Sequence, residues 1–187
     1  MGNPWDVRSQ PSKGDSSFEP IFLQVGRALS AWETAESALA ELFDVLVAAQ
    51  PSNRAAFASF AAVKSSSARG ELLAAAFARA MDQSDPAYDD TAAIIDQFGR
   101  YSARRNELAH GRVYNLGEHG FQLGPNNIMP HKWKDGVAKY QYASEDVAHY
   151  ATRFEVLASA ISALATALLA RNIAARSTQS TRSRRQR

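Results

Sequence analysis

Residues 104–111, RRNELAHG, combine charged side chains with good helix formers and end in a glycine. One helical face runs into this segment at steps of four and three residues. Its members are Ile94, Phe98, Tyr101, Arg105 and Leu108. We expect a helix from about Pro86 to His110, ended by Gly111. Arg105 then lies on the inward face, where a charge is costly unless it is paired, solvated or at an interface.

Three further segments have the helical spacing of apolar residues. The first stripe, which Glu36 interrupts, is Phe22, Val25, Leu29, Trp32, Leu39, Phe43 and Leu46. The second helix starts after Pro51 and continues through Phe77, with the serines at 65–67 able to bend it. The last starts at Ser144, and its stripe is Val147, Tyr150, Phe154, Leu157, Ile161, Leu164 and Leu168. Four long helices with mostly short links predict an all-α, antiparallel four-helix bundle.

The helical pattern breaks between the third and fourth long helices, over an insertion at about 112–143. Residues 112–127, RVYNLGEHGFQLGPNN, predict two short strands around a Gly-Glu-His-Gly turn. The segment KYQYAS, 139–144, predicts another extended piece. Insertions of this length are usually functional or loosely ordered, so we expect this β-like insertion to gate a site, bind a partner or block a cleft.

Two features of the insertion have competing interpretations. Trp133 lies between two lysines, so it either packs against its own bundle or stacks on a nucleic-acid base. His119 and His131 lack the spacing to a third histidine or a carboxylate that a metal site needs. We therefore expect no metal and no cofactor.

Composition predicts one soluble domain with polar ends. The chain has 187 residues and no cysteine, so neither disulfides nor thiolate metal sites are expected. No signal-peptide pattern or long apolar run is visible, so we expect a cytoplasmic protein without membrane contact. We expect a flexible arm over 1–18, a helical bundle over 19–170 and a disordered basic tail over 171–187. The Ala-rich last helix fits a core or dimer seam better than a membrane surface.

The basic character of the chain is concentrated in its tail. Residues 171–187 contain six arginines and no acid, which leaves 15 Lys and Arg against 19 Asp and Glu in the rest. The body is therefore slightly acidic although the whole chain has a net charge of +2. Such a tail is either a solubilising segment or an electrostatic arm for nucleic acid.

The polar residues before Gly111 have a structural and a functional interpretation. Arg105 and Glu36 both interrupt apolar stripes, so they could form a buried ion pair that fixes the register of the bundle. His110 could simply cap the last helical turn. Alternatively, Asn106 and His110 share a helix face, and Arg105 lies about 140° away on an ideal helix. An arginine that binds phosphate and a histidine that transfers protons are the parts for cleaving a phosphodiester without metal.

The segment RNELAH, placed in the third helix of a small helical bundle, resembles the signature of the HEPN superfamily. That signature is an arginine, a polar residue that is commonly asparagine, and a histidine after four to six intervening residues. Arg105, Asn106 and His110 match it position by position. The segments 67–73, SARGELL, and 32–43, WETAESALAELF, also look like the preceding helices of such proteins.

The resemblance implies a homodimer and, in many members, a metal-independent ribonuclease of a defence or toxin–antitoxin system. Two motif-bearing helix ends would form one cleft across the two-fold axis. The RNA 2′-hydroxyl would be the nucleophile, His110 the general acid or base, and Arg105 the stabiliser of the charged transition state. Asn106 would orient the phosphate, while Arg104 and Arg112 would hold the RNA backbone. An antitoxin protein is a further expected partner.

Two alternatives stay open. Some HEPN proteins keep the fold as a non-catalytic interaction or nucleic-acid-binding module. The chain could also be an unrelated structural bundle. Exposure of Arg105 and His110 together in a concave cleft would favour catalysis, whereas a pair of Arg105 with Glu36 under the insertion would disfavour it.

Overall fold

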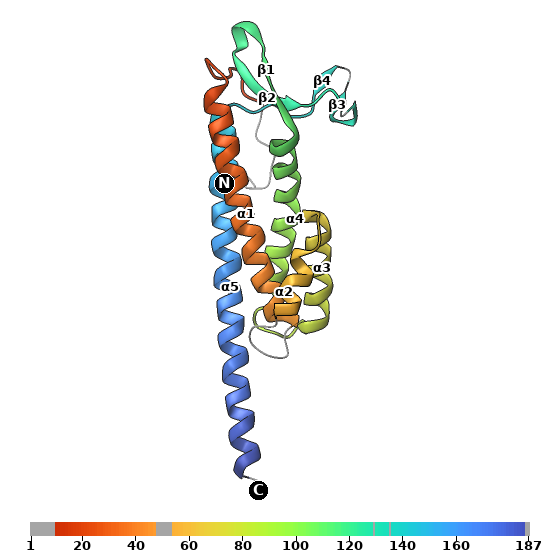
Figure 1. Cartoon of the computed structure of the whole chain (residues 1–187), viewed down its shortest axis with the longest axis vertical. Helices are drawn as coiled ribbons and strands as arrows, with labels where there is room; N and C mark the ends of the chain where they lie inside the picture. The colour runs from red at the N-terminus through yellow and green to blue at the C-terminus, as the bar shows by residue number, and fades with distance from the viewer. Residues whose placement is uncertain (1–9, 48–53, 129, 135, 186–187) are drawn as a thin grey trace. The chain divides into compact units, whose positions relative to one another are not determined.

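The structure is a computed structural model that describes residues 10–47, 54–128, 130–134 and 136–185. Most of these residues are helical, and two small antiparallel sheets lie between the last two helices in the chain (Figure 1). The α-helices of this part of the chain are α1 (Glu19–Val47), α2 (Arg54–Ala61), α3 (Ser66–Ala80), α4 (Tyr88–His110) and α5 (Ser144–Arg185). The predicted helical class with a β-containing insertion is therefore confirmed.

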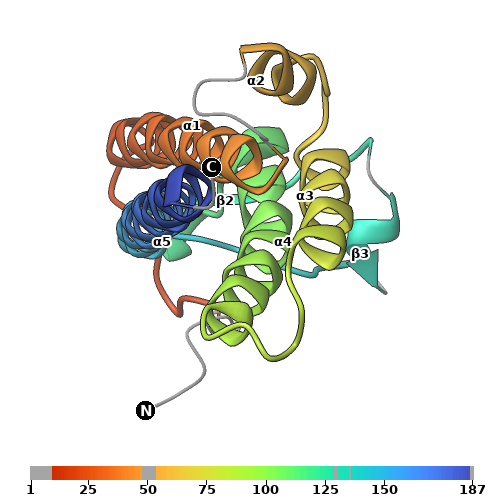
Figure 2. The ribbon, with the colours of Figure 1, turned by 90° about the horizontal axis from the view of Figure 1, so that it is seen from below.

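The helix predicted from after Pro51 through Phe77 is instead two helices, α2 and α3 (Figure 2). Ser65 has an extended backbone, and its side-chain oxygen accepts the N–H of Ala68 at 3.1 Å. This is the geometry of an N-cap, which begins a new helix. The chain therefore forms two helices, with Ser65 as the N-cap of the second, and the prediction of a bend in one helix was wrong.

The described chain divides into two compact units, each built from two stretches of sequence. The first unit comprises Met1–Ala35 and Asp96–Leu157, and the second comprises Glu36–Ile95 and Ala158–Arg187. Helices α1, α4 and α5 each contribute residues to both units.

An aromatic cluster forms the core of the first unit. The ring of Trp32 stacks on Phe98 with a centroid distance of 4.7 Å, and it meets Phe154 edge-on at 5.1 Å. Tyr101 also packs against Phe154, at 5.7 Å. These buried rings come from α1, α4 and α5, so each predicted stripe supplies part of one core.

The predicted stripe of the first helix is wrong at its beginning. Phe22 is 56% exposed, whereas its neighbour Ile21 is fully buried. Trp32 and Leu39 are fully buried as the stripe predicts. The inward face of α1 therefore begins at Ile21 and leaves Phe22 at the surface.

Helix α4 continues into the insertion without a loop. It ends at His110, and strand β1 (Gly111–Asn115) begins with the next residue. Strand β2 (Phe121–Pro125) pairs antiparallel with β1 in the register Gly111↔Pro125, around the short 3₁₀ helix η1 (Gly117–His119). A second hairpin, β3 (Trp133–Lys134) with β4 (Val137–Ala138), follows η2 (Pro130–Lys132). The predicted strands around the Gly-Glu-His-Gly turn are confirmed.

Gly111, directly after the last residue of α4, lies where a side chain would not fit. A Cβ at this position would lie 2.8 Å from the carbonyl oxygen of Glu107 and 2.8 Å from a methyl carbon of Leu123. The backbone φ angle of Gly111 is not positive. The glycine therefore permits close approach of β2 to the end of α4, rather than a left-handed helix cap.

Residues 10–18, which the sequence assigns to a flexible arm, are fixed to the insertion and to α5. The backbone of Asp15 exchanges hydrogen bonds with that of Phe121, at 2.8 and 3.0 Å. The Asp15 carboxylate accepts from the backbone N–H of Ser144 at 2.7 Å and from its hydroxyl at 2.6 Å. A residue far away in sequence thus caps the first turn of α5. Residues 1–9 of the predicted arm lie outside the described residues.

The second unit contains a buried ion pair that involves Glu36. Its carboxylate accepts hydrogen bonds from the guanidinium of Arg69 and from the hydroxyl of Ser66, both on α3. Glu36 is 7% exposed, so the charge is compensated where it is buried. The interruption of the first stripe is therefore explained by Arg69, and the predicted pair of Glu36 with Arg105 is not formed.

Helix α5 extends through the segment that the sequence predicts to be a disordered basic tail, since it is helical to Arg185. Arg171, at the start of that segment, bonds to Asp85 at 2.6 Å. Among the described residues, Ser144–Ser177 is the single stretch long and apolar enough to cross a membrane by length and composition. One such helix is a weak indication, because the core helix of a soluble protein can have the same properties.

Candidate functional site

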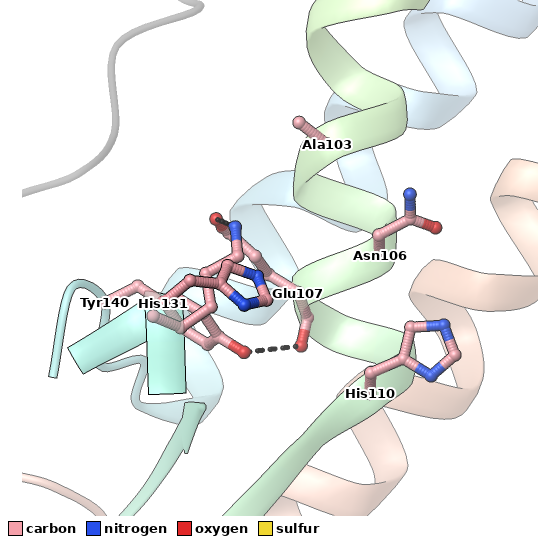
Figure 3. Close-up of a pocket in the computed structure, with 7 residues that line it drawn as sticks. Ala103, Asn106, Glu107, His110, His131 and Tyr140 are labelled. Carbon is pink, nitrogen blue, oxygen red and sulfur yellow. Dashed lines mark hydrogen bonds and ion pairs between the residues drawn. The ribbon is translucent and has the colours of Figure 1, made fainter. Parts of the chain in front are cut away.

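The end of α4 carries the motif that the sequence singles out. Asn106 and His110 are both exposed and lie one helical turn apart. They line a cavity of about 350 Å³ (Figure 3). The cavity also receives His131 and Lys132 from η2 and Tyr140 from the segment before α5. The two predicted polar residues therefore meet residues of the insertion at one open site.

Arg105 lies beside this cavity and is not part of its lining. One of its terminal nitrogens donates to the side-chain oxygen of Asn106 at 3.3 Å. The other lies 3.9 Å from the carboxylate of Glu33 on α1. The side chain is 26% exposed, and its Nε is buried without a hydrogen-bond partner in the described structure. The structure thus joins Arg105 to Asn106 and to Glu33, but it does not include Arg105 in the lining of the cavity.

A buried carboxylate ties the insertion to α4 next to the site. Glu107 is 6% exposed, and it accepts the hydroxyl of Tyr142 at 2.7 Å and the guanidinium of Arg104 at 3.0 Å. The ammonium of Lys132 lies 3.6 Å from its other oxygen. The hydroxyl of Tyr140 donates to the Glu107 backbone carbonyl at 3.4 Å, along the dashed line of Figure 3. These bonds fix the position of the cavity wall that the insertion supplies.

The two tyrosines of this cluster are held in the neutral form. Burial, followed by the negative charge of Glu107, raises the pKa of Tyr140 to about 12. The same two causes raise the pKa of Tyr142 further above its usual value. A neutral phenol keeps its proton, so both hydroxyls act as hydrogen-bond donors at neutral pH.

The two arginines predicted to hold RNA have different surroundings. Arg104 is 16% exposed and is engaged by Glu107, so its charge is largely used inside the protein. Arg112 is exposed on β1, and its guanidinium lies 5.8 Å from the centroid of the Tyr114 ring. The structure therefore leaves Arg112 accessible to a phosphate and holds Arg104 as part of the Glu107 cluster.

Sequence reasoning missed three residues that shape the site. The sequence suggests His131 only as a metal ligand and Tyr140 only as part of an extended segment, and its pattern assigns no role to Glu107. The sequence contains one signal for Glu107, because Arg104 lies three residues before it and opposite charges at this helical spacing interact. Within the described residues, no group of three or more His, Asp and Glu side chains is arranged to hold a metal ion.

Comparisons with known proteins give no independent guide to this site. A scan against protein-family models, a search of curated proteins and a search of solved structures each found no match to this chain.

Proposed function

We propose that the chain is a HEPN-type, metal-independent endoribonuclease whose helices form the antiparallel four-helix bundle of that superfamily. The observation that carries the proposal is the shared exposure of Asn106 and His110 in one open cavity, beside the cation of Lys132. A cavity of about 350 Å³ has room for a phosphodiester group and part of a ribose. An RNA substrate in a defence or toxin–antitoxin system implies a cytoplasmic location.

In the proposed reaction, the 2′-oxygen of the RNA attacks the adjacent phosphorus and the bond to the 5′-oxygen breaks. His110 removes the proton of the 2′-hydroxyl or supplies a proton to the leaving 5′-oxygen, and water carries out the other of these two proton transfers. Asn106 donates its amide hydrogens to a phosphate oxygen, and Arg105, bound to the Asn106 oxygen, orients this amide and adds positive charge. The products are a 2′,3′-cyclic phosphate and a 5′-hydroxyl.

Substitution of His110 by alanine tests the catalytic assignment. Cleavage of a fluorescent single-stranded RNA should fall by about two to four orders of magnitude, because proton transfer by a positioned side chain is lost. His119→Ala is the matched control, since His119 is exposed on η1 and does not line the cavity. EDTA should not change the rate, and RNA with 2′-O-methyl groups should resist cleavage. Undiminished cleavage by folded His110→Ala protein would end the assignment.

The second candidate is a non-catalytic HEPN-like module that binds RNA or a protein. The position of Arg105 favours it, because the guanidinium lies near Glu33 and outside the cavity. Fluorescence anisotropy with 2′-O-methyl RNA measures binding, and cleavage of unmodified RNA of the same sequence separates the two candidates. Unmodified RNA that the wild-type chain never cleaves, although the 2′-O-methyl RNA is bound, would support the binding module.

We also propose that the active form is a homodimer, with an antitoxin protein as a further partner. Large apolar side chains are exposed on α1 and α5, and a second copy would bury such surface. They are Phe22, Leu23, Val156, Leu169 and Ile173. Light scattering at tens of micromolar should report twice the mass of one chain, and a monomer would contradict the proposal.

The basic tail, 171–187, is proposed to add electrostatic affinity for RNA. Its deletion should weaken RNA binding and flatten the dependence of log Kd on log salt concentration, because fewer phosphate contacts release fewer counterions. A chain in which the tail arginines are replaced by glutamines is the control for helix length. Unchanged affinity and salt dependence would leave the tail with a solubilising role.

A further inference from the structure

The insertion contains a second cavity that the proposed reaction does not use. It measures about 340 Å³ and is lined by residues of both hairpins, among them Tyr114, Gln122, Trp133 and Val137. None of the residues that line it belongs to the cavity of His110. A cavity of this size is large enough for a single heteroaromatic ring system.

Two polar groups of this cavity lack the hydrogen bonds that buried groups normally make. Gln122 is 3% exposed; its amide nitrogen donates to the carbonyl of Pro11 at 3.4 Å, but its amide oxygen has no partner. The indole N–H of Trp133 is also buried without a partner. Two residues that line the cavity therefore each carry a buried polar atom without a hydrogen-bond partner, an acceptor on Gln122 and a donor on Trp133.

The walls of the cavity are aromatic. The rings of Tyr114 and Trp133 meet edge-on at a centroid distance of 6.4 Å, and both side chains are half-buried, so part of each ring stays accessible. The hydroxyl of Tyr114 donates to the carbonyl of Pro125 at 2.9 Å, which fixes the direction of its ring. Accessible aromatic rings of this kind are the usual platforms on which single-stranded nucleic acids stack their bases.

Each of the two rings has a positively charged residue near it in space or next to it in the sequence. The guanidinium of Arg112 lies 5.8 Å from the Tyr114 ring centroid, and Lys134 is exposed next to Trp133. In contrast, the ammonium of Lys132 is directed to Glu107. A ligand that joins a planar ring to a phosphate could place the ring against the aromatic side chains and the phosphate near these cations.

We propose that this cavity, which we call the insertion pocket, binds one unpaired nucleobase carried on a phosphate. The edge of each common base presents an acceptor next to a donor, so a bound base can supply the partners that the indole N–H of Trp133 and the amide oxygen of Gln122 lack, once these side chains turn toward it. Tyr114 contributes stacking, and Arg112 contacts the phosphate. The inference that this base belongs to an RNA strand rests on the proposed function. The inference that the pocket binds a base does not depend on it.

The experiment follows the indole N–H resonance of Trp133 by NMR in the full-length ¹⁵N-labelled chain. The chain has three tryptophans, and Trp133→Phe assigns the signal. Nucleoside monophosphates, their parent nucleosides, ribose 5-phosphate and 2′-O-methyl tetranucleotides of A, C and U are the probes. Compounds that carry a base should shift the Trp133 signal saturably, while the signal of the buried Trp32 stays in place. A larger effect of the tetranucleotides identifies a strand, rather than a free nucleotide, as the ligand.

Variants test the separate contacts. Tyr114→Leu should weaken nucleotide binding by about 5- to 150-fold through lost stacking. Arg112→Gln should weaken binding of monophosphates but not of nucleosides. His119→Ala, outside the pocket, should change neither affinity. The wild-type titration decides the matter even if a pocket variant does not fold.

Three outcomes would overturn the inference. They are a Trp133 signal that no base-containing probe moves at millimolar concentration, an equal shift by ribose 5-phosphate, and a shift of all tryptophan signals alike. The same titration on His110→Ala protein separates this inference from the proposed function. Base binding without any RNA cleavage by the wild type would refute the ribonuclease alone, and cleavage without a Trp133 response would refute the pocket alone.

Discussion

Replacement of Glu107 by alanine should destabilise the protein strongly, because this carboxylate joins α4 to the insertion. It accepts bonds from Tyr142 at 2.7 Å and from Arg104 at 3.0 Å, and it is 6% exposed. Hydrogen bonds to a charged group contribute about 1.5–3 kcal/mol each. Lys132 is 32% exposed and 3.6 Å away, so its contribution is about 0–1 kcal/mol. Because removal also strands the Arg104 charge, we expect the free energy of unfolding to fall by about 3–5 kcal/mol.

Glu107→Gln serves as the matched variant. The amide keeps an acceptor for the hydroxyl of Tyr142 but loses the negative charge that Arg104 requires, so the expected loss is about 1–3 kcal/mol. In combination with Tyr142→Phe, the two losses should be less than additive by about 0.5–3 kcal/mol, because the residues share one bond.

Urea denaturation at pH 7, followed by circular dichroism, provides the measurement. Protein concentration must be the same for all variants, because the proposed dimer would make the apparent stability depend on concentration. A loss below about 1 kcal/mol for Glu107→Ala would refute the reasoning, since it would mean that Arg104 and Tyr142 find equally good partners in water.

Other perturbations probe alkaline stability, close packing and the second ion pair. Because burial raises the pKa of Tyr140 to about 12, the folded state holds this proton more tightly than the unfolded state. Stability should be complete below about pH 10 and should fall by about 2–3 kcal/mol as pH rises to 12, as measured by urea denaturation, with a smaller fall in Tyr140→Phe. Gly111→Ala should cost about 1–3 kcal/mol through the contacts at 2.8 Å, whereas Gly26→Ala, in open space, should be neutral or stabilising in the same assay. Arg69→Met should cost about 3–5 kcal/mol by leaving the buried Glu36 without its guanidinium, and a thermal midpoint equal to that of the wild type would contradict this.

The sequence predicts those parts of the fold that depend on local periodicity. The stripe of α5 is correct at Val147, Phe154 and Ile161, which are fully buried. A long helix with a single apolar face can bury that face in only one orientation about its axis. The predicted end of α4 before Gly111 is also correct, although this position requires a glycine because of close packing and not because of a left-handed backbone. The split between α2 and α3 was missed because Ser65 acts as an N-cap, a role that composition alone does not distinguish from a bend.

The candidate site was predictable only where helical spacing decides it. Asn106 and His110 meet because they are four residues apart on α4, whereas Arg105, about 140° from His110 on an ideal helix, bonds to Asn106 and does not line the cavity. The contributions of His131 and Tyr140 depend on how the insertion folds back on the helix. That arrangement is set by contacts such as Tyr142 with Glu107, which join residues 35 positions apart, and local pattern does not determine it.

The bond between Asp15 and Ser144 also has a consequence for biosynthesis. The two residues are 129 positions apart, and the first unit joins Met1–Ala35 to Asp96–Leu157. At about 5–20 residues per second, roughly 6–26 s separate the synthesis of the two partners. Trp32 therefore leaves the ribosome long before Phe154, the ring that covers it. This unit cannot complete its core co-translationally from its N-terminal segment alone, so its folding must wait for the start of α5.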